Sequence, residues 1–119
     1  MEFKDSRITL GRSLSDYTKV QFFYSYFIRN SRAQIKSLPL KDYLNIGCGP
    51  NIDEQFINVD YQWRPGIHIC WDLCNGLPPL QSNSFKGVYT EHCLEHIDFE
   101  SCKKVIHDAF RILKPEGIF

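Results

Sequence analysis

The chain has 119 residues, of which 43% are hydrophobic and 14% aromatic, and its 14 Lys/Arg balance its 14 Asp/Glu. A chain of this length fits one domain with a real core, and its composition excludes a disordered or fibrous protein. No apolar run approaches the roughly 20 residues of a membrane span, and residues 1–15 lack the apolar stretch of a secretory signal, so we expect a cytoplasmic protein.

The first predicted element is a helix from about residue 16 to residue 36, with Ser15-Asp16 as its cap. Its apolar residues recur at helical spacing, at Tyr17, Val20, Tyr24, Phe27, Ile28 and Ile35. Phe22, Phe23 and Tyr26 fall off this stripe, so we expect the helix to pack against two surfaces or to touch a partner, core packing being the commoner outcome. Pro39 marks the boundary of an amino-terminal basic aromatic helical segment, residues 1–40.

Charge is distributed unevenly between this segment and the rest of the chain. Residues 1–41 carry eight Lys/Arg and three Asp/Glu, whereas residues 42–119 carry six and eleven. A basic segment suits an anionic partner such as a phosphate, a nucleic acid or an acidic lipid headgroup. Two oppositely charged segments of one fold also attract each other, and the scattered basic residues favour this second interpretation.

Residues 41–119 consist of short apolar runs bounded by turn residues, which predicts strands. The predicted strands are residues 43–46, 56–59, 67–71 and 85–90, followed by a helix capped by Asp98, a closing Pro115-Glu116-Gly117 and a fifth run from Ile118. Acidic and polar residues follow the strands, as in an open, mostly parallel Rossmann-like α/β sheet with flanking helices, where ligands bind beyond the carboxyl ends. About nine residues, 47–55, join the first two strands, so the usual crossover helix is expected to be a turn.

A glycine turn, Gly47-Cys48-Gly49, follows the first predicted strand. Glycine lets the backbone approach a ligand, although such a pair also serves an ordinary tight turn. Asp60, eleven residues after Gly49, ends the next strand, where a carboxylate accepts both hydroxyls of a ribose or merely caps a turn. This spacing does not separate a nicotinamide cofactor from an adenosyl one.

Seven short segments occur in a fixed order: Leu44–Pro50, Phe56–Asp60, Trp71–Leu73, Leu77–Pro78, Ser84–Phe85, Leu94–Ile97 and Arg111–Gly117. The series resembles class I S-adenosylmethionine-dependent methyltransferases, close to a small group whose first motif reads Leu-Asn-x-Gly-Cys-Gly. The resemblance covers residues 41–119 and implies a partial, cofactor-binding domain that stops at the start of the fifth strand, with later strands missing. An unpaired sheet edge would then favour a homodimer, through that edge or through the amino-terminal helix.

The resemblance implies that the cofactor is S-adenosyl-L-methionine. It assigns to the cofactor Asn45, Gly47, Cys48, Gly49, Asp60, Tyr61, Asp72, Leu73, Thr90 and Glu91. The glycine turn would line the methionine portion, Asp60 the ribose, and Asp72 and Leu73 the adenine, while Thr90, Glu91 and His92 would border the methyl group. Asn45 stands where many members carry an acid that grips the methionine amino group, which predicts weaker binding.

Methyl transfer needs chiefly an in-line approach and exclusion of water, so a catalytic base is optional. For a hydroxyl or amine acceptor, His92 or His96 is the natural proton acceptor, although His96 could equally be a structural histidine under the fourth strand. The acceptor itself stays open among small molecules, sugars and proteins. The near-neutral total charge disfavours nucleic acid.

Two other classes of function compete with methyl transfer. His92-Cys93-Leu94-Glu95-His96 matches the zinc-peptidase signature His-x-x-Glu-His, which needs a helix and a further ligand downstream, yet only 23 residues follow His96. A structural zinc site at His68, Cys70 and Cys74 would lack a second pair of zinc-ligating residues. The chain has five cysteines and no Cys-x-x-Cys motif, which indicates reduced thiols. The other competitor is a non-catalytic binding module on the same fold, which uses its aromatic helix to engage a partner.

Overall fold

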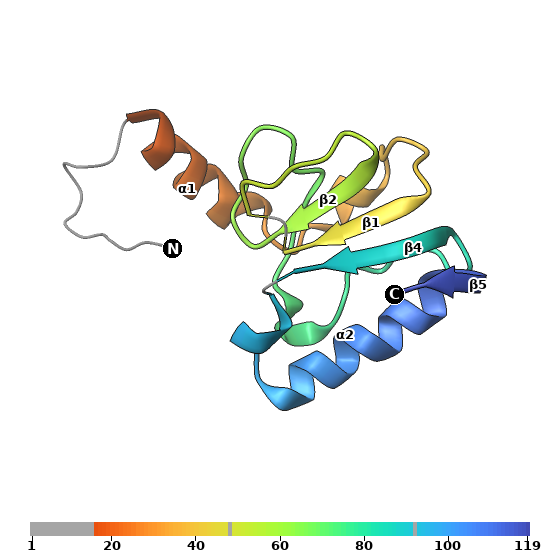
Figure 1. Cartoon of the computed structure of the whole chain (residues 1–119). Helices are drawn as coiled ribbons and strands as arrows, with labels where there is room; N and C mark the ends of the chain where they lie inside the picture. The colour runs from red at the N-terminus through yellow and green to blue at the C-terminus, as the bar shows by residue number, and fades with distance from the viewer. Residues whose placement is uncertain (1–15, 48, 92) are drawn as a thin grey trace.

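The protein folds around a five-stranded parallel sheet with strand order β3-β2-β1-β4-β5 (Figure 1). The computed structural model describes residues 16–47, 49–91 and 93–119. Its strands are β1 (Tyr43–Ile46), β2 (Phe56–Asp60), β3 (Ile69–Cys70), β4 (Phe85–Thr90) and β5 (Leu113–Ile118). Its helices are α1 (Asp16–Ile28) and α2 (Phe99–Ile112), with short 3-10 helices η3 (Arg32–Ile35), η4 (Leu73–Asn75) and η5 (Leu94–His96). The predicted Rossmann-like α/β fold is confirmed.

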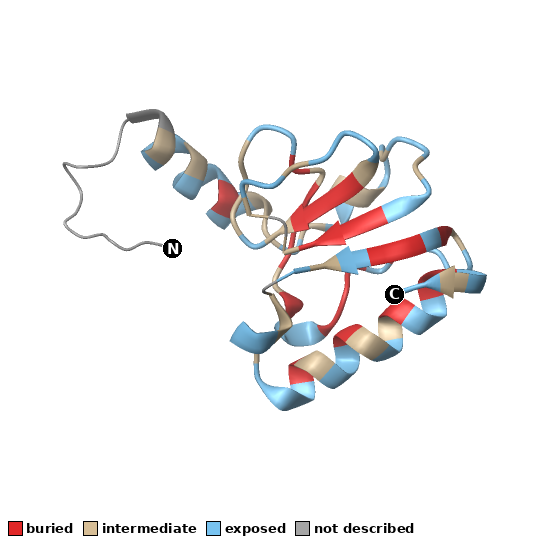
Figure 2. Ribbon diagram, in the orientation of Figure 1, coloured by how far each residue is buried: buried red, intermediate tan, exposed pale blue. Residues whose placement is uncertain are grey.

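The core lies between one face of the sheet and α2. Along β1 and β2, the side chains that face this core include Leu44, Ile46, Ile57 and Val59, all almost completely buried. Buried residues of α2 recur at helical spacing, at Ser101, Val105, Ala109 and Ile112. Figure 2 shows the buried residues concentrated in the strands and along one side of α2. Asp98 caps α2 as predicted, accepting a hydrogen bond from the backbone of Ser101 at 3.4 Å.

The first helix is shorter than predicted. It ends at Ile28 rather than near residue 36, because Asn30 adopts a left-handed conformation (φ 67°), which asparagine tolerates better than most residues. The chain resumes as η3. The expectation that the helix packs against two surfaces is also wrong for the described residues, since Phe23, Tyr26 and Phe27 are 67–74% exposed. The expectations for residues 1–15 lie outside the described residues, and no described helix is long and apolar enough to cross a membrane.

Two strand boundaries differ from the prediction. β3 contains only Ile69–Cys70, because a turn closed by the Ile67 N–H on the Arg64 carbonyl at 3.0 Å precedes it. The fifth strand begins at Leu113, directly after α2, rather than at Ile118. Its Pro115 has no N–H to donate, and its pairing with β4 shifts register between Phe85 and Gly87, as is common on edge strands.

A turn replaces the crossover helix between β1 and β2, as their close spacing predicts. The buried side-chain amides of Asn45 and Asn58 anchor this turn. The Asn45 Nδ2 donates to the Asn51 carbonyl and to the Asn58 Oδ1, both at 3.1 Å. Asn58, which is fully buried, donates its own Nδ2 to the Asp53 carbonyl at 2.9 Å. Side-chain hydrogen bonds therefore satisfy backbone groups that a helix would have paired within itself.

The β3 edge of the sheet is covered by residues that follow α1. Gln34 Oε1 accepts from the Cys70 N–H at 2.7 Å, and its Nε2 donates to the Cys70 carbonyl at 3.1 Å. The same Nε2 lies 2.9 Å from the carbonyls of Ile28 and Ser31. One side chain thus binds the strand edge and the turn after α1 together, which protects the edge from pairing with another strand.

Candidate functional site

A cavity of about 280 Å³ opens at the carboxyl ends of β1, β2 and β3. It is lined by residues of four segments: Gly47, Val59, Asp60, Tyr61, Trp71, Asp72, Leu73, Cys93, His96 and Ile97. Its volume lies near the lower limit of small-molecule sites, about 300–1,000 Å³. This is also the sheet edge where ligands of open α/β folds bind.

The glycine turn forms one wall of the cavity. Gly47 and Gly49 both have positive φ, 65° and 55°. A Cβ on Gly47 would lie 2.6 Å from the Cβ of Cys93, whereas a Cβ on Gly49 would meet nothing within 4 Å. Gly47 is therefore required both by its backbone conformation and by the close approach of Cys93, and Gly49 faces open space. Cys48, between them, lies outside the described residues.

Asp60 occupies the end of β2, as predicted. Its Oδ2 accepts hydrogen bonds from the Gln62 N–H at 3.3 Å and from Arg64 Nη1 at 3.1 Å. Both bonds reach the same oxygen, and no described residue forms a hydrogen bond with Oδ1. The carboxylate is thus fixed in orientation while one oxygen stays available to a hydroxyl ligand.

The segment after β3 supplies the opposite wall. Asp72 accepts a hydrogen bond from the Cys74 N–H at 3.0 Å and caps η4, and Leu73 is buried beside it. Trp71 is only 8% exposed, and its Nε1 has no hydrogen-bond acceptor among the described residues. An unpaired buried donor is uncommon, because losing its hydrogen bond to water is costly.

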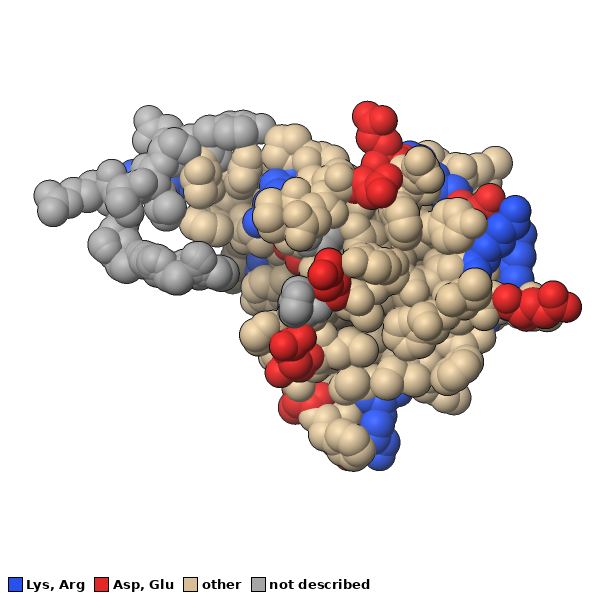
Figure 3. Space-filling view, viewed as in Figure 1, with Lys and Arg blue, Asp and Glu red and all other residues tan. Residues whose placement is uncertain are grey.

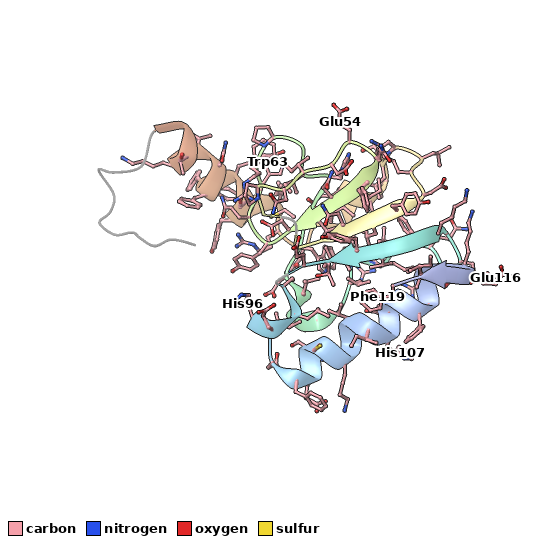
Figure 4. All side chains as sticks on the ribbon, in the orientation of Figure 1. Glu54, Trp63, His96, His107, Glu116 and Phe119 are labelled. Atoms are coloured by element: carbon pink, nitrogen blue, oxygen red, sulfur yellow. The ribbon has the colours of Figure 1, made fainter. Side chains whose placement is uncertain are left out.

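His96 is the predicted catalytic histidine that reaches the cavity. It is exposed on η5, and Figure 4 places it where the carboxyl ends of the strands meet. It is not packed under the fourth strand, which was the structural alternative. His92 lies outside the described residues.

Several predicted residues are not among those that line the cavity. Asn45 is buried in the crossover network, and Gly49 lies in the turn but lines no part of it. Thr90 lines a different cavity of about 420 Å³, with Val88, Tyr89 and Phe119. Glu91 is exposed and accepts a hydrogen bond from the Tyr89 hydroxyl at 2.8 Å, which raises the pKa of Tyr89.

Four lining residues were missed by sequence reasoning: Val59, Trp71, Cys93 and Ile97. Val59 and Trp71 directly precede the predicted Asp60 and Asp72, and Cys93 and Ile97 flank Leu94–His96. Their position next to motif residues is the feature of the sequence that could have identified them. Burial raises the pKa of the Cys93 thiol above its ordinary value. The thiol is therefore protonated at neutral pH.

The cavity is acidic. Asp60 and Asp72 line it, and its described lining residues include neither Lys nor Arg. Figure 3 shows Asp and Glu side chains near the end of the sheet where the strands finish, with Lys and Arg side chains beside them towards α1 and a group of both charges at the other end. The two lining carboxylates, of which Asp60 is paired with Arg64 at 3.1 Å, favour a cationic group on the ligand over an anionic one.

The described residues give no zinc site at His68, Cys70 and Cys74, whereas His92 of the other zinc alternative lies outside the described residues. η5 is a three-residue 3-10 helix rather than the α-helix that His-x-x-Glu-His requires. Within the described ranges no three His, Cys, Asp or Glu side chains are grouped to hold a metal ion. His68 Nδ1 accepts a hydrogen bond from the Asn58 N–H at 2.9 Å, so this nitrogen is already used within the fold.

Comparison with known proteins agrees with this arrangement. The family model for a methyltransferase domain matches residues 35–119, from within η3 to the last residue of the chain. No curated protein and no solved structure matches the chain. Because the family match spans well over half of the sequence, the chain belongs to this family of class I S-adenosylmethionine-dependent methyltransferases.

Proposed function

We propose that the chain binds S-adenosyl-L-methionine in the cavity at the carboxyl ends of β1, β2 and β3. Its methyl group would pass to a small molecule, a sugar or a protein. The observation that carries the proposal is that one cavity gathers Gly47, Asp60 and Asp72, which lie at the ends of three neighbouring strands. An extended ligand lying across these strand ends touches all three.

The lining residues suit the parts of this cofactor. The methionine portion would lie beside Gly47, the residue of the glycine turn that lines the cavity. Oδ1 of Asp60 would accept from the ribose, and Tyr61 lies next to it. Leu73 offers an apolar surface to the adenine, and Asp72 offers an acceptor for its amino group.

Two features favour an adenosyl sulfonium over a dinucleotide. A dinucleotide places its pyrophosphate on the amino terminus of the helix that follows the glycine turn. Here the described residues between β1 and β2 contain no helix, and the cavity offers carboxylates rather than basic side chains. A sulfonium and an ammonium group carry the opposite charge to these carboxylates.

When bound, the cofactor supplies an electrophilic methyl group. The contribution of the chain is to orient the ligand and to exclude water, for which Val59, Leu73 and Ile97 provide apolar walls. His96, exposed at the cavity, would take a proton from a hydroxyl or amine acceptor.

Calorimetry with S-adenosylhomocysteine, the demethylated product, tests the proposal. In Asp60→Asn the dissociation constant should rise about 10-fold to 100-fold, since a hydrogen bond to a charged group contributes roughly 1.5–3 kcal/mol. The control is Asp42→Asn, because Asp42 also forms an ion pair, with Lys86 at 3.4 Å, but precedes β1 at the other end of the sheet. Failure of the intact chain to bind either the product or S-adenosylmethionine would overturn the proposal.

A non-catalytic interaction module on the same fold is the second candidate. It is favoured by α1, on which Phe23, Tyr26 and Phe27 remain largely exposed. Light scattering of the intact chain and of Phe23→Ser/Phe27→Ser tests it: self-association that disappears in the variant supports this role. A chain that transfers radiolabelled methyl groups to a cell extract is an enzyme instead.

A further inference from the structure

We propose that Arg29 and Asn30, which directly follow α1, are positioning residues that hold the two loops proposed to bind adenosine in the cavity. The inference rests on the proposed function, because these loops carry Tyr61 and Asp72. Neither Arg29 nor Asn30 lines the cavity itself. Their effect on a bound adenosine would therefore pass through the loops.

Asn30 holds the loop after β3. Its backbone N–H donates to the Cys70 carbonyl at 3.0 Å, and its Oδ1 accepts from the Asp72 N–H at 2.8 Å. The side chain of Asp72 is fixed separately, by the Cys74 N–H. The left-handed conformation of Asn30 (φ 67°) turns the chain so that both contacts form at once.

Arg29 holds the loop after β2. Its Nε donates to the Tyr61 carbonyl at 2.9 Å, and its guanidinium carbon lies 3.6 Å from the centre of the Tyr61 ring. The same carbonyl accepts from the Cys70 thiol at 3.0 Å. Both the backbone and the ring of this cavity residue are thus fixed by one side chain.

The end of α1 is itself anchored, so it can act as a fixed reference. The fully buried Ser25 accepts on its Oγ a hydrogen bond from the Trp63 N–H at 2.8 Å, and its carbonyl accepts from the Arg29 N–H at 2.9 Å. Tyr24 packs edge-on against Trp63, with ring centres 5.0 Å apart, and Figure 4 shows Trp63 beside α1. Two adjacent residues of an anchored helix end therefore set the separation of two loops before any ligand arrives, which lowers the entropic cost of binding.

Asn30→Gly tests this idea, because glycine keeps the left-handed backbone and removes only the acceptor for Asp72. Calorimetry should show affinity for S-adenosylhomocysteine and for 5′-methylthioadenosine falling by the same factor, about fivefold to tenfold, the effect of one hydrogen bond. Asn30→Asp keeps an oxygen acceptor and should retain most of the affinity. Arg29→Lys, which cannot reproduce the planar stacking on Tyr61, should weaken both ligands similarly.

Asn83→Gly is the matched control, since Asn83 also has a left-handed conformation (φ 55°) but lies in the turn before β4. If Asn30 has a purely structural role, Asn30→Gly should lower the melting temperature but leave the dissociation constants of both ligands equal to those of Asn83→Gly. That result would overturn the inference. Loss of affinity in Asn30→Asp equal to that in Asn30→Gly would also overturn it. If the intact chain binds neither ligand, both the proposed function and this inference fail. If the intact chain binds them and Asn30→Gly binds them with unchanged affinity, only this inference fails.

Discussion

Gly47 and Cys93 pack directly against each other in the cavity wall, so that a Cβ on Gly47 would lie 2.6 Å from the Cβ of Cys93. The two residues are 46 positions apart in the chain, after β1 and before η5. The glycine turn is therefore held against two segments. It contacts the segment after β4 through Cys93, and the Gly47 N–H donates to the carbonyl of Val59 in β2 at 2.8 Å. Because of this contact, a side chain at Gly47 would collide with Cys93, whereas a side chain at Gly49 would not.

Gly47→Ala should destabilise the protein more than Gly49→Ala. Both substitutions carry the cost of a positive φ, about 1–2 kcal/mol, but only Gly47→Ala also collides with Cys93. Urea denaturation gives the two free energies of unfolding. The double variant Gly47→Ala/Cys93→Gly removes the collision and should recover part of the loss. Equal effects of the two single variants would contradict the contact.

Gln34→Ala should lower the free energy of unfolding by about 1–3 kcal/mol, because it leaves the Cys70 N–H and several carbonyls without their partner. The exposed β3 edge should also make the variant more prone to aggregate. Gln55→Ala, an exposed glutamine in the crossover turn, is the control and should be close to neutral. Urea denaturation and light scattering at matched concentrations measure both effects.

Asn58→Ala should cost about 3 kcal/mol or more, since the fully buried Asn58 bonds to Asn45 and to both backbone groups of Asp53. The crossover turn would lose its attachment, and hydrogen exchange of residues 51–55 should accelerate. The exposed Asn75 offers Asn75→Ala for comparison. Exchange in the turn that matches the unsubstituted protein would show that Asn58 does not hold it.

Stability should decrease as the pH falls below about 6.5, the ordinary pKa of histidine. Burial, and secondly the nearby Lys41, lower the pKa of His68, whose Nδ1 must stay unprotonated to accept from the Asn58 N–H. Because the folded pKa lies below the unfolded one, this contribution is complete above the unfolded pKa and is lost as the pH falls through the folded pKa. Unfolding titrations from pH 8 to pH 5 should show a shallower decline in His68→Gln than in the unsubstituted protein. His107→Gln, at an exposed position on α2, should keep the full decline.

Local pattern was enough to predict most of the elements. Short apolar runs bounded by turn residues marked β1 and β2, and Asp98 followed by apolar residues at helical spacing marked α2, because these signals arise from neighbours in the chain. The same logic placed Asp60 at the end of β2 and Gly47 in a turn. It failed at residue 30, where a left-handed asparagine ends α1 inside an apolar pattern that continues to Ile35.

What the sequence by itself determined is therefore the order of the strands and helices and the identity of the motif residues at the strand ends. The tertiary structure decided which residues meet: that Trp71, Cys93 and Ile97 complete the cavity, that Asn45 binds Asn58, and that Gln34 covers Cys70 from 36 positions away. Periodicity reports only which face of an element is apolar. Hydrogen bonds between distant side chains depend on where whole elements lie in space, and packing of the sheet, α1 and α2 fixes that.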